Sequence, residues 1–185
     1  MTPAPALAAR FLSAWQALGG EFEYHANPTA ARLGLLAYLG GLNTRALLAW
    51  PPQELCLPGL AEALAAAGYT LVQPERRHLD PDLSAGLTAA DAGLAETGSL
   101  VLAQALTRSW LPALIPIRHI ILLPQSRLHA DLRAWRQAWQ QEGRAQALCH
   151  SLIITGPSFS DDIELHPHRG MFGPRHLHLV LFDDG

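Results

Sequence analysis

The sequence predicts an α/β layer fold, in which a mixed but mainly parallel sheet carries helices on both faces. The first observation is that helix and strand patterns alternate along most of the chain. The second is composition: 49% of the 185 residues are hydrophobic and only 16% are charged, which favours a large core or a buried interface, including one between copies of the chain. No Gly/Ser-rich linker interrupts the sequence, so we expect a single domain over residues 1–185.

The first two helices enclose a strand. Leu7, Phe11 and Trp15 recur at helical spacing, which predicts a helix over 6–18 that ends at the following glycine pair. Residues 21–24 alternate polar and apolar side chains, as a half-buried strand does. Asn27 before Pro28 is a strong helix start, so a second helix is expected over 27–40.

The next elements repeat this order. The short apolar run 45–50 stops at two prolines and predicts a strand. Residues 57–68 are rich in Ala and Leu and close on a glycine, as a helix does, and 69–72 reads as a strand. Residues 73–86 contain prolines and charge clusters and are expected to be mostly connection.

A hairpin and further strands follow. The runs 92–95 and 100–103 flank a polar turn and predict the hairpin that makes the sheet mixed. Leu128, Leu132, Trp135 and Trp139 form a helical stripe of core or interface residues. Strands are also expected over 119–123, 151–155 and 176–182.

Charge and residue usage exclude several classes of protein. The net charge is −3, so we expect no nucleic-acid partner. All 13 basic residues are arginine, which excludes Schiff-base chemistry, a pyridoxal-phosphate anchor and a Walker A lysine. The most apolar stretch, 111–124, is short and interrupted by prolines and charges, so no membrane insertion is expected.

The two cysteines, Cys56 and Cys149, are far apart and form no C-x-x-C pair. A zinc knuckle, a thioredoxin motif and an iron–sulfur cluster held by this chain alone are therefore unsupported, and no cofactor is expected. We expect reduced thiols and a cytoplasmic location.

The turn Glu96-Thr97-Gly98-Ser99 is the first candidate site, because ligands of open α/β sheets bind beyond the ends of strands. Glu96 is the candidate catalytic base or nucleophile, Gly98 allows close backbone approach, and the two hydroxyls are candidate ligand contacts. The alternative is ordinary turn chemistry, which uses the same residue types.

The second candidate is the segment 155–164, which follows a predicted strand. Gly156, Ser158, Asp162 and Glu164 are candidate ligand contacts, because crowded carboxylates imply a cation or a raised pKa. The alternative is a helical turn capped by Ser158 or Ser160.

Arginines and histidines near the C-terminus give further candidates. Arg175, with Arg169, could clamp a small carboxylate, the alternative being two solvated loop residues. The pairs His166/His168 and His176/His178 have strand spacing that could chelate a metal, but they lack a third ligand motif, so no metal is assigned.

Two runs, 88–102 and 154–164, contain A-E-T-G-S and T-G-P-S followed by D-I-E. In these runs, and in the spacing to Gly173-Pro174 and Leu177–Val180, the sequence resembles the LUD domain, in particular the lactate utilization protein C family. The resemblance implies a three-layer α/β/α sandwich like that of the CoA-transferase, ribose-phosphate isomerase and glucosamine-phosphate isomerase group. It implies a role in bacterial oxidation of L-lactate to pyruvate, beside partner subunits that carry iron–sulfur clusters.

Two positions depart from the family pattern: Phe159 stands where Arg is usual and Phe172 where His is usual. Both changes replace a polar side chain by an aromatic one, which favours a changed ligand or a partner-binding role. Whether the chain is itself an enzyme stays open. The alternative is a small-molecule enzyme in which Glu96 acts on an acyl or sugar-phosphate substrate, Gly98 and Gly156 amides hold the oxyanion, and the acids of 162–164 orient the substrate.

Overall fold

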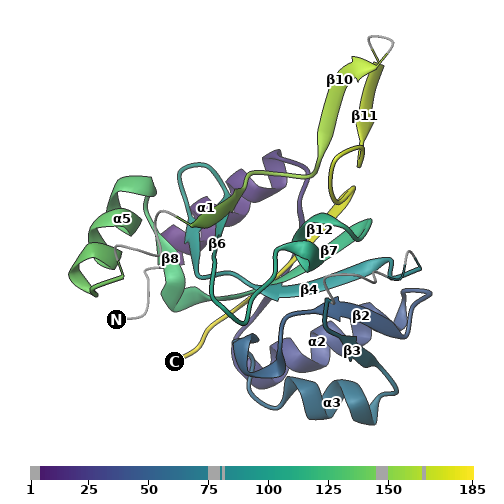
Figure 1. Cartoon of the computed structure of the whole chain (residues 1–185). Coiled ribbons are helices and arrows are strands. Elements are labelled where there is room, and N and C mark those ends of the chain that lie inside the picture. Colours follow the sequence, from purple (N-terminus) through teal and green to yellow (C-terminus); the bar gives the residue numbers. More distant parts are fainter. Residues whose placement is uncertain (1–4, 75–79, 81, 145–149, 164–165) are drawn as a thin grey trace.

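The computed structural model describes residues 5–74, 80, 82–144, 150–163 and 166–185 (Figure 1). Its strands form two sheets and a separate two-stranded arm. The α/β class expected from the sequence is confirmed, and so is the mainly parallel pairing. Across the described ranges, no helix combines the length and apolar character needed to traverse a bilayer.

The larger sheet has six strands, and every neighbouring pair in it is parallel. The order across it is β1-β12-β7-β4-β2-β3. Its strands are β1 (Glu21–His25), β2 (Ala46–Ala49), β3 (Thr70–Val72), β4 (Ala85–Ala89), β7 (Arg118–Pro124) and β12 (His176–Phe182).

The smaller sheet has the order β8-β5-β6-β9 and contains the predicted hairpin, β5 with β6, in antiparallel pairing. The antiparallel strands therefore lie in a second sheet instead of mixing into the first. Its strands are β5 (Ala92–Leu94), β6 (Ser99–Ala103), β8 (Leu128–His129) and β9 (Ser151–Ile154).

Five α-helices are described, and α1 and α2 follow the sequence expectations closely. They are α1 (Pro5–Ala17), α2 (Pro28–Gly40), α3 (Leu60–Ala66), α4 (Leu111–Leu114) and α5 (Leu132–Gln141). The side chain of Asn27 accepts the Ala30 N–H at 2.8 Å, which is the predicted cap of α2.

One apolar core joins α1, α2 and α3 to both sheets. α2 packs on β1 and β12, whereas α1 contacts both β1 and β8. A second, smaller cluster on the other side of the hairpin seats Trp135 and Trp139 of α5. The predicted core role of these two indoles is confirmed, whereas Leu128 belongs to β8 and Leu132 is 52% exposed.

Two segments differ from expectation. β4 (Ala85–Ala89) begins at the end of the stretch 73–86, which we expected to be mostly connection, and continues beyond it where no strand was predicted; its residues are all buried between β2 and β7. The segment after Gly156 forms no helical turn at Ser158 or Ser160; it enters β10 (Phe159–Ile163), which pairs with β11 (His166–Arg169) as the projecting arm of Figure 1.

Candidate functional site

The strand order reverses between β2 and β4. From β2 the chain moves outward to β3, whereas β4, β7 and β12 follow one another in the opposite direction across the sheet. In open α/β sheets, ligands bind in the crevice outside the carboxyl ends of the strands at such a point. Trp50 follows β2 there, and Ala90 and Asp91 follow β4.

A cavity of about 350 Å³ lies at this edge. This volume is at the lower end of the range, about 300–1,000 Å³, in which small-molecule sites fall. Its walls come from three segments that follow β2, β3 and β6: Ala49, Trp50, Pro51, Gln73, Pro74, Gln104, Leu106, Thr107, Arg108, Ser109, Trp110 and Leu111.

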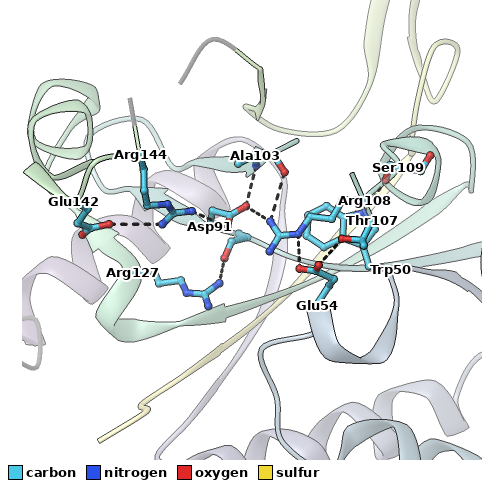
Figure 2. A network of polar contacts seen from close by, with 11 residues as sticks. Trp50, Glu54, Asp91, Ala103, Thr107, Arg108, Ser109, Arg127, Glu142 and Arg144 are labelled. Carbon is cyan, nitrogen blue, oxygen red and sulfur yellow. Dashed lines mark hydrogen bonds and ion pairs between the residues drawn. The ribbon is translucent and has the colours of Figure 1, made fainter. Parts of the chain in front are cut away.

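Arg108 connects the cavity wall to a network of carboxylates (Figure 2). Its Nη1 donates to Asp91 Oδ2 at 2.7 Å, and its Nε donates to Glu54 Oε2 at 2.8 Å. The guanidinium carbon lies 4.6 Å from the ring centroid of Trp50, close enough for cation–π attraction. Trp50 in turn donates its indole N–H to the Ser109 carbonyl at 2.7 Å, so both ends of the 108–109 segment are fixed.

Asp91 is the buried centre of this network, with its side chain 5% exposed. Besides Arg108, its Oδ2 accepts the backbone N–H of Ala103 at 2.8 Å, and Arg144 lies 3.5 Å from Oδ1. A carboxylate this deep is tolerated because charged and hydrogen-bonding groups surround it. Asp91 therefore ties the end of β4 to the end of β6 and to the cavity wall.

Glu54 holds the outer side of Arg108. It accepts a hydrogen bond from the hydroxyl of Thr107 at 2.5 Å as well as the one from Arg108. The Thr107 hydrogen bond is the main cause that lowers the pKa of Glu54, and Arg108 adds to it. Both contacts favour the charged form of Glu54.

The hydrogen bonds of Arg108 to described residues use two of its three nitrogens. These are Nε and Nη1, so Nη2 carries no hydrogen bond to the part of the chain that the structure describes. The side chains of Gln73 and Gln104 line the same cavity and can donate or accept. A guanidinium edge next to amide groups can bind a carboxylate or a similar small anion.

The predicted turn at Glu96 is divided between two environments. Glu96 and Thr97 are exposed, whereas Gly98 and Ser99 are buried. Glu96 lines a wide, shallow hollow with the N-terminal part of α5, formed with Asp131, Leu132, Arg133 and Arg136. The N–H of Gly98 donates to the Leu94 carbonyl at 2.9 Å, so in this structure it is not free for an oxyanion.

Gly98 has a backbone reason to be glycine. Its φ is +67°, and a Cβ there would lie 2.6 Å from the backbone N of Trp15. The turn therefore packs directly against α1. Ser99 continues the contact network, since its Oγ lies 2.7 Å from Thr97 Oγ1 and 2.8 Å from Thr155 Oγ1.

The second predicted segment meets the turn at Thr155, through the contact with Ser99. Gly156 lies against Leu18, with φ +89°. Ser158 and Arg175 sit at the base of the arm: Ser158 Oγ accepts the Phe172 N–H at 3.1 Å, and Arg175 Nε donates to the Arg169 carbonyl at 3.3 Å.

The predicted site residues therefore lie in different surroundings, some exposed in the turn, some buried beneath it and some at the base of the arm. The hollow at Glu96 is lined by α5 residues, and neither Ser158 nor Arg175 is among them. The backbone of Asp162 lies in β10, and Glu164 lies outside the described residues.

The two histidine pairs lie on different strands, His166/His168 on β11 and His176/His178 on β12. His168 is exposed on β11, whereas His178 is buried and stacks on Tyr38 with ring centroids 3.5 Å apart. The pKa of His178 is lowered, chiefly because its ring is buried. Within the described ranges, no group of three or more His, Cys, Asp or Glu side chains is placed to hold a metal ion.

Sequence reasoning did not single out Asp91, Arg108 or Glu54 as functional. Asp91 was inside the A-D-A-G-L-A-E-T-G-S run, but nothing in that run identifies its partners. The one local signal was the Trp50-Pro51 stop after a buried strand, which marks a strand end without showing which segment meets it.

Comparisons with known proteins confirm the resemblance expected from the sequence. A sequence model of the LUD domain matches residues 60–182. Two curated relatives, from Shouchella clausii and from an Exiguobacterium species, are both called lactate utilization protein C; they are 28% identical over 147 residues and 35% identical over 117 residues. These matches cover 77% and 60% of this chain but only 64% and 50% of the relatives, so the chain spans less than two thirds of their length.

Among solved structures, a DUF162 family protein from Deinococcus radiodurans has a similar fold. The TM-score is 0.65 with 19% sequence identity, and the similarity covers 96% of each chain. This similarity extends along nearly the whole chain and supports the fold.

Proposed function

The chain belongs to the LUD domain family, and from this membership and the crevice at Arg108 we propose that it is a component of a bacterial lactate-utilization system. The observation that carries the proposal is that both curated relatives bear the name lactate utilization protein C. In its finer form, the proposal is that the system oxidises L-lactate to pyruvate with separate iron–sulfur subunits. The chain's two cysteines are fewer than the four that commonly hold one cluster, so the electron carriers belong on those subunits.

The ligand in this proposal is a small organic acid at the end of β2 and β4. In this proposal Arg108 supplies the charged donor for the carboxylate through Nη2, which bonds to none of the described residues. Gln104 lines the same cavity and can reach a hydroxyl or keto oxygen. The carboxylates of Asp91 and Glu54 keep the guanidinium in one orientation, so little ordering is left for binding.

A second candidate function is a small-molecule enzyme centred on Glu96. What favours it is the exposed Glu96 carboxylate in a hollow shared with Arg133 and Arg136, which could hold a phosphate or carboxylate group. It lacks the Gly98 amide as an oxyanion donor, because that N–H is used within the turn. We therefore prefer the cavity at Arg108 as the ligand site.

Growth on L-lactate separates the two candidates. A deletion strain is complemented with Gln104→Ala, Glu96→Gln or the control Gln137→Ala, which alters an exposed glutamine on α5. We expect slow growth only with Gln104→Ala. If growth is normal with Gln104→Ala but fails with Glu96→Gln, the functional site is instead the hollow at α5.

Binding tests the ligand directly. Titration of the purified chain with L-lactate and with pyruvate should show saturable heat, and Arg108→Gln should weaken it at least about tenfold, the value of one charge-assisted hydrogen bond. Tagged protein from lactate-grown cells should also recover iron-containing subunits. If the deletion leaves growth on lactate unchanged and the protein purifies without iron, the proposed function is wrong.

A further inference from the structure

The arm formed by β10 and β11 projects from the body of the molecule (Figure 1). Among the described strands, these two pair only with each other. An isolated two-stranded ribbon is marginally stable in water. The arm therefore gains stability if something packs against it.

Apolar side chains gather where the arm meets the body. Six large ones are exposed there: Phe172 at 81%, Phe159 at 60%, Ile115 at 54%, Ile117 at 50%, Met171 at 48% and Leu114 at 38%. Soluble monomers seldom expose so many large apolar groups together unless the surface is used. We call these six residues the arm-base patch.

The segments of this patch are held together by direct contacts. The Phe172 N–H bonds to Ser158, the neighbour of Phe159. The Ile117 carbonyl accepts the backbone N–H groups of Arg175 and His176. The patch is thus built from the end of α4 and the segment after it, the start of β10 and the loop after β11.

Charge around the patch is divided in a way that suits self-association. Exposed Arg169 and Arg175 lie at the base of the arm, whereas exposed Asp161 lies further out along β10. Asp161 is two residues beyond Phe159, which places it about 7 Å further out at about 3.3 Å per residue. When two arms run antiparallel, the outer Asp161 of one copy therefore approaches the basic base of the other.

We propose that the arm-base patch is the interface between two copies of this chain, related by a two-fold axis, with each arm lying over the base of the other. A two-fold interface requires a surface that is complementary to itself, and an apolar patch with basic residues at the base of the arm and an acidic residue midway along β10 meets this requirement. The proposal does not depend on the proposed function.

Sedimentation velocity of the full chain tests the interface. We expect the wild-type chain to sediment at twice the mass of one chain at micromolar concentration, and Phe172→Asp to sediment as a monomer with an unchanged circular dichroism spectrum. Leu33→Asp is the matched control, because Leu33 is 62% exposed on α2, away from the arm, and should leave the dimer intact.

Charge reversal tests the geometry. Asp161→Arg and Arg175→Asp should each be monomeric alone, because like charges then face each other across the axis. An equimolar mixture of the two variants should restore the dimer mass, since each chain then supplies the charge that the other lacks. Any of three results would overturn the proposal: a monomeric wild type, a dimer that persists with Phe172→Asp, or a mixture that stays monomeric. A monomeric wild type would indicate that the patch binds a different protein.

Discussion

Removal of the Asp91 carboxylate should destabilise the protein more than any other single change in the network. Asp91→Ala takes away the acceptor for Arg108 at 2.7 Å and for the Ala103 N–H at 2.8 Å, both beside a side chain that is 5% exposed. Breaking a buried pair by removing one partner costs about 3–5 kcal/mol, because the other charge stays buried. For a chain of this size, that loss lowers the melting temperature by roughly 6–20 °C.

Thermal melting and urea unfolding of three variants measure this effect. Asp91→Asn keeps an acceptor for Ala103 and should lose less than Asp91→Ala. Arg144→Ala is the control, because Arg144 is 42% exposed, 3.5 Å from Asp91, and should cost no more than about 1 kcal/mol. A drop of under about 2 °C for Asp91→Ala would refute the claim that this network holds the hairpin and cavity wall together.

Three further changes test other parts of the structure. Because the pKa of Glu54 is lowered in the folded protein, its contribution to the free energy of unfolding is present above its ordinary pKa of about 4.3 and is lost as pH falls. Glu54→Gln should therefore destabilise the protein by about 1–2 kcal/mol at pH 7, and by much less in acid-denaturation series below about pH 4. Burial lowers the pKa of His119 to about 3. As pH falls below about 6.5, this side chain therefore binds a proton in the unfolded state but not in the native state, and the free energy of unfolding drops by up to about 1.4 kcal/mol per pH unit. His119→Gln should flatten that slope in urea titrations. Gly98→Ala should cost about 1–3 kcal/mol through the clash with Trp15, measured against Gly143→Ala, which has a similar positive φ but open space around it; equal melting temperatures would show that the turn does not pack as described.

Local signals predicted most of the helices and strands. The Asn27-Pro28 start of α2 and the polar turn of the β5–β6 hairpin are written in a few consecutive residues, and the structure contains both. β4 was missed because Ala85, Gly86 and Ala89 have little preference for strands. It is a strand because β2 and β7 pair with it from both sides, which no local pattern reveals.

The candidate site was harder to predict for the same reason. Arg108 meets Glu54 across 54 positions of sequence and Asp91 across 17, and no spacing motif encodes either pairing. The polar turn at Glu96 stood out in the sequence, yet its glycine is explained by contact with α1. Residue type identified where the chain turns, whereas the cavity depends on which strand ends lie side by side.

The pairing of β1 with β12 has a consequence for biosynthesis. Glu21 lies beside His178, so β1 can find its neighbour only after the much later strand β12 has left the ribosome. Until then, the apolar side of α1 and β1 stays exposed on the nascent chain, where it can bind chaperones or aggregate. A chain that loses its last ten residues would therefore leave its amino-terminal strand without a partner, however well the middle of the protein had already folded.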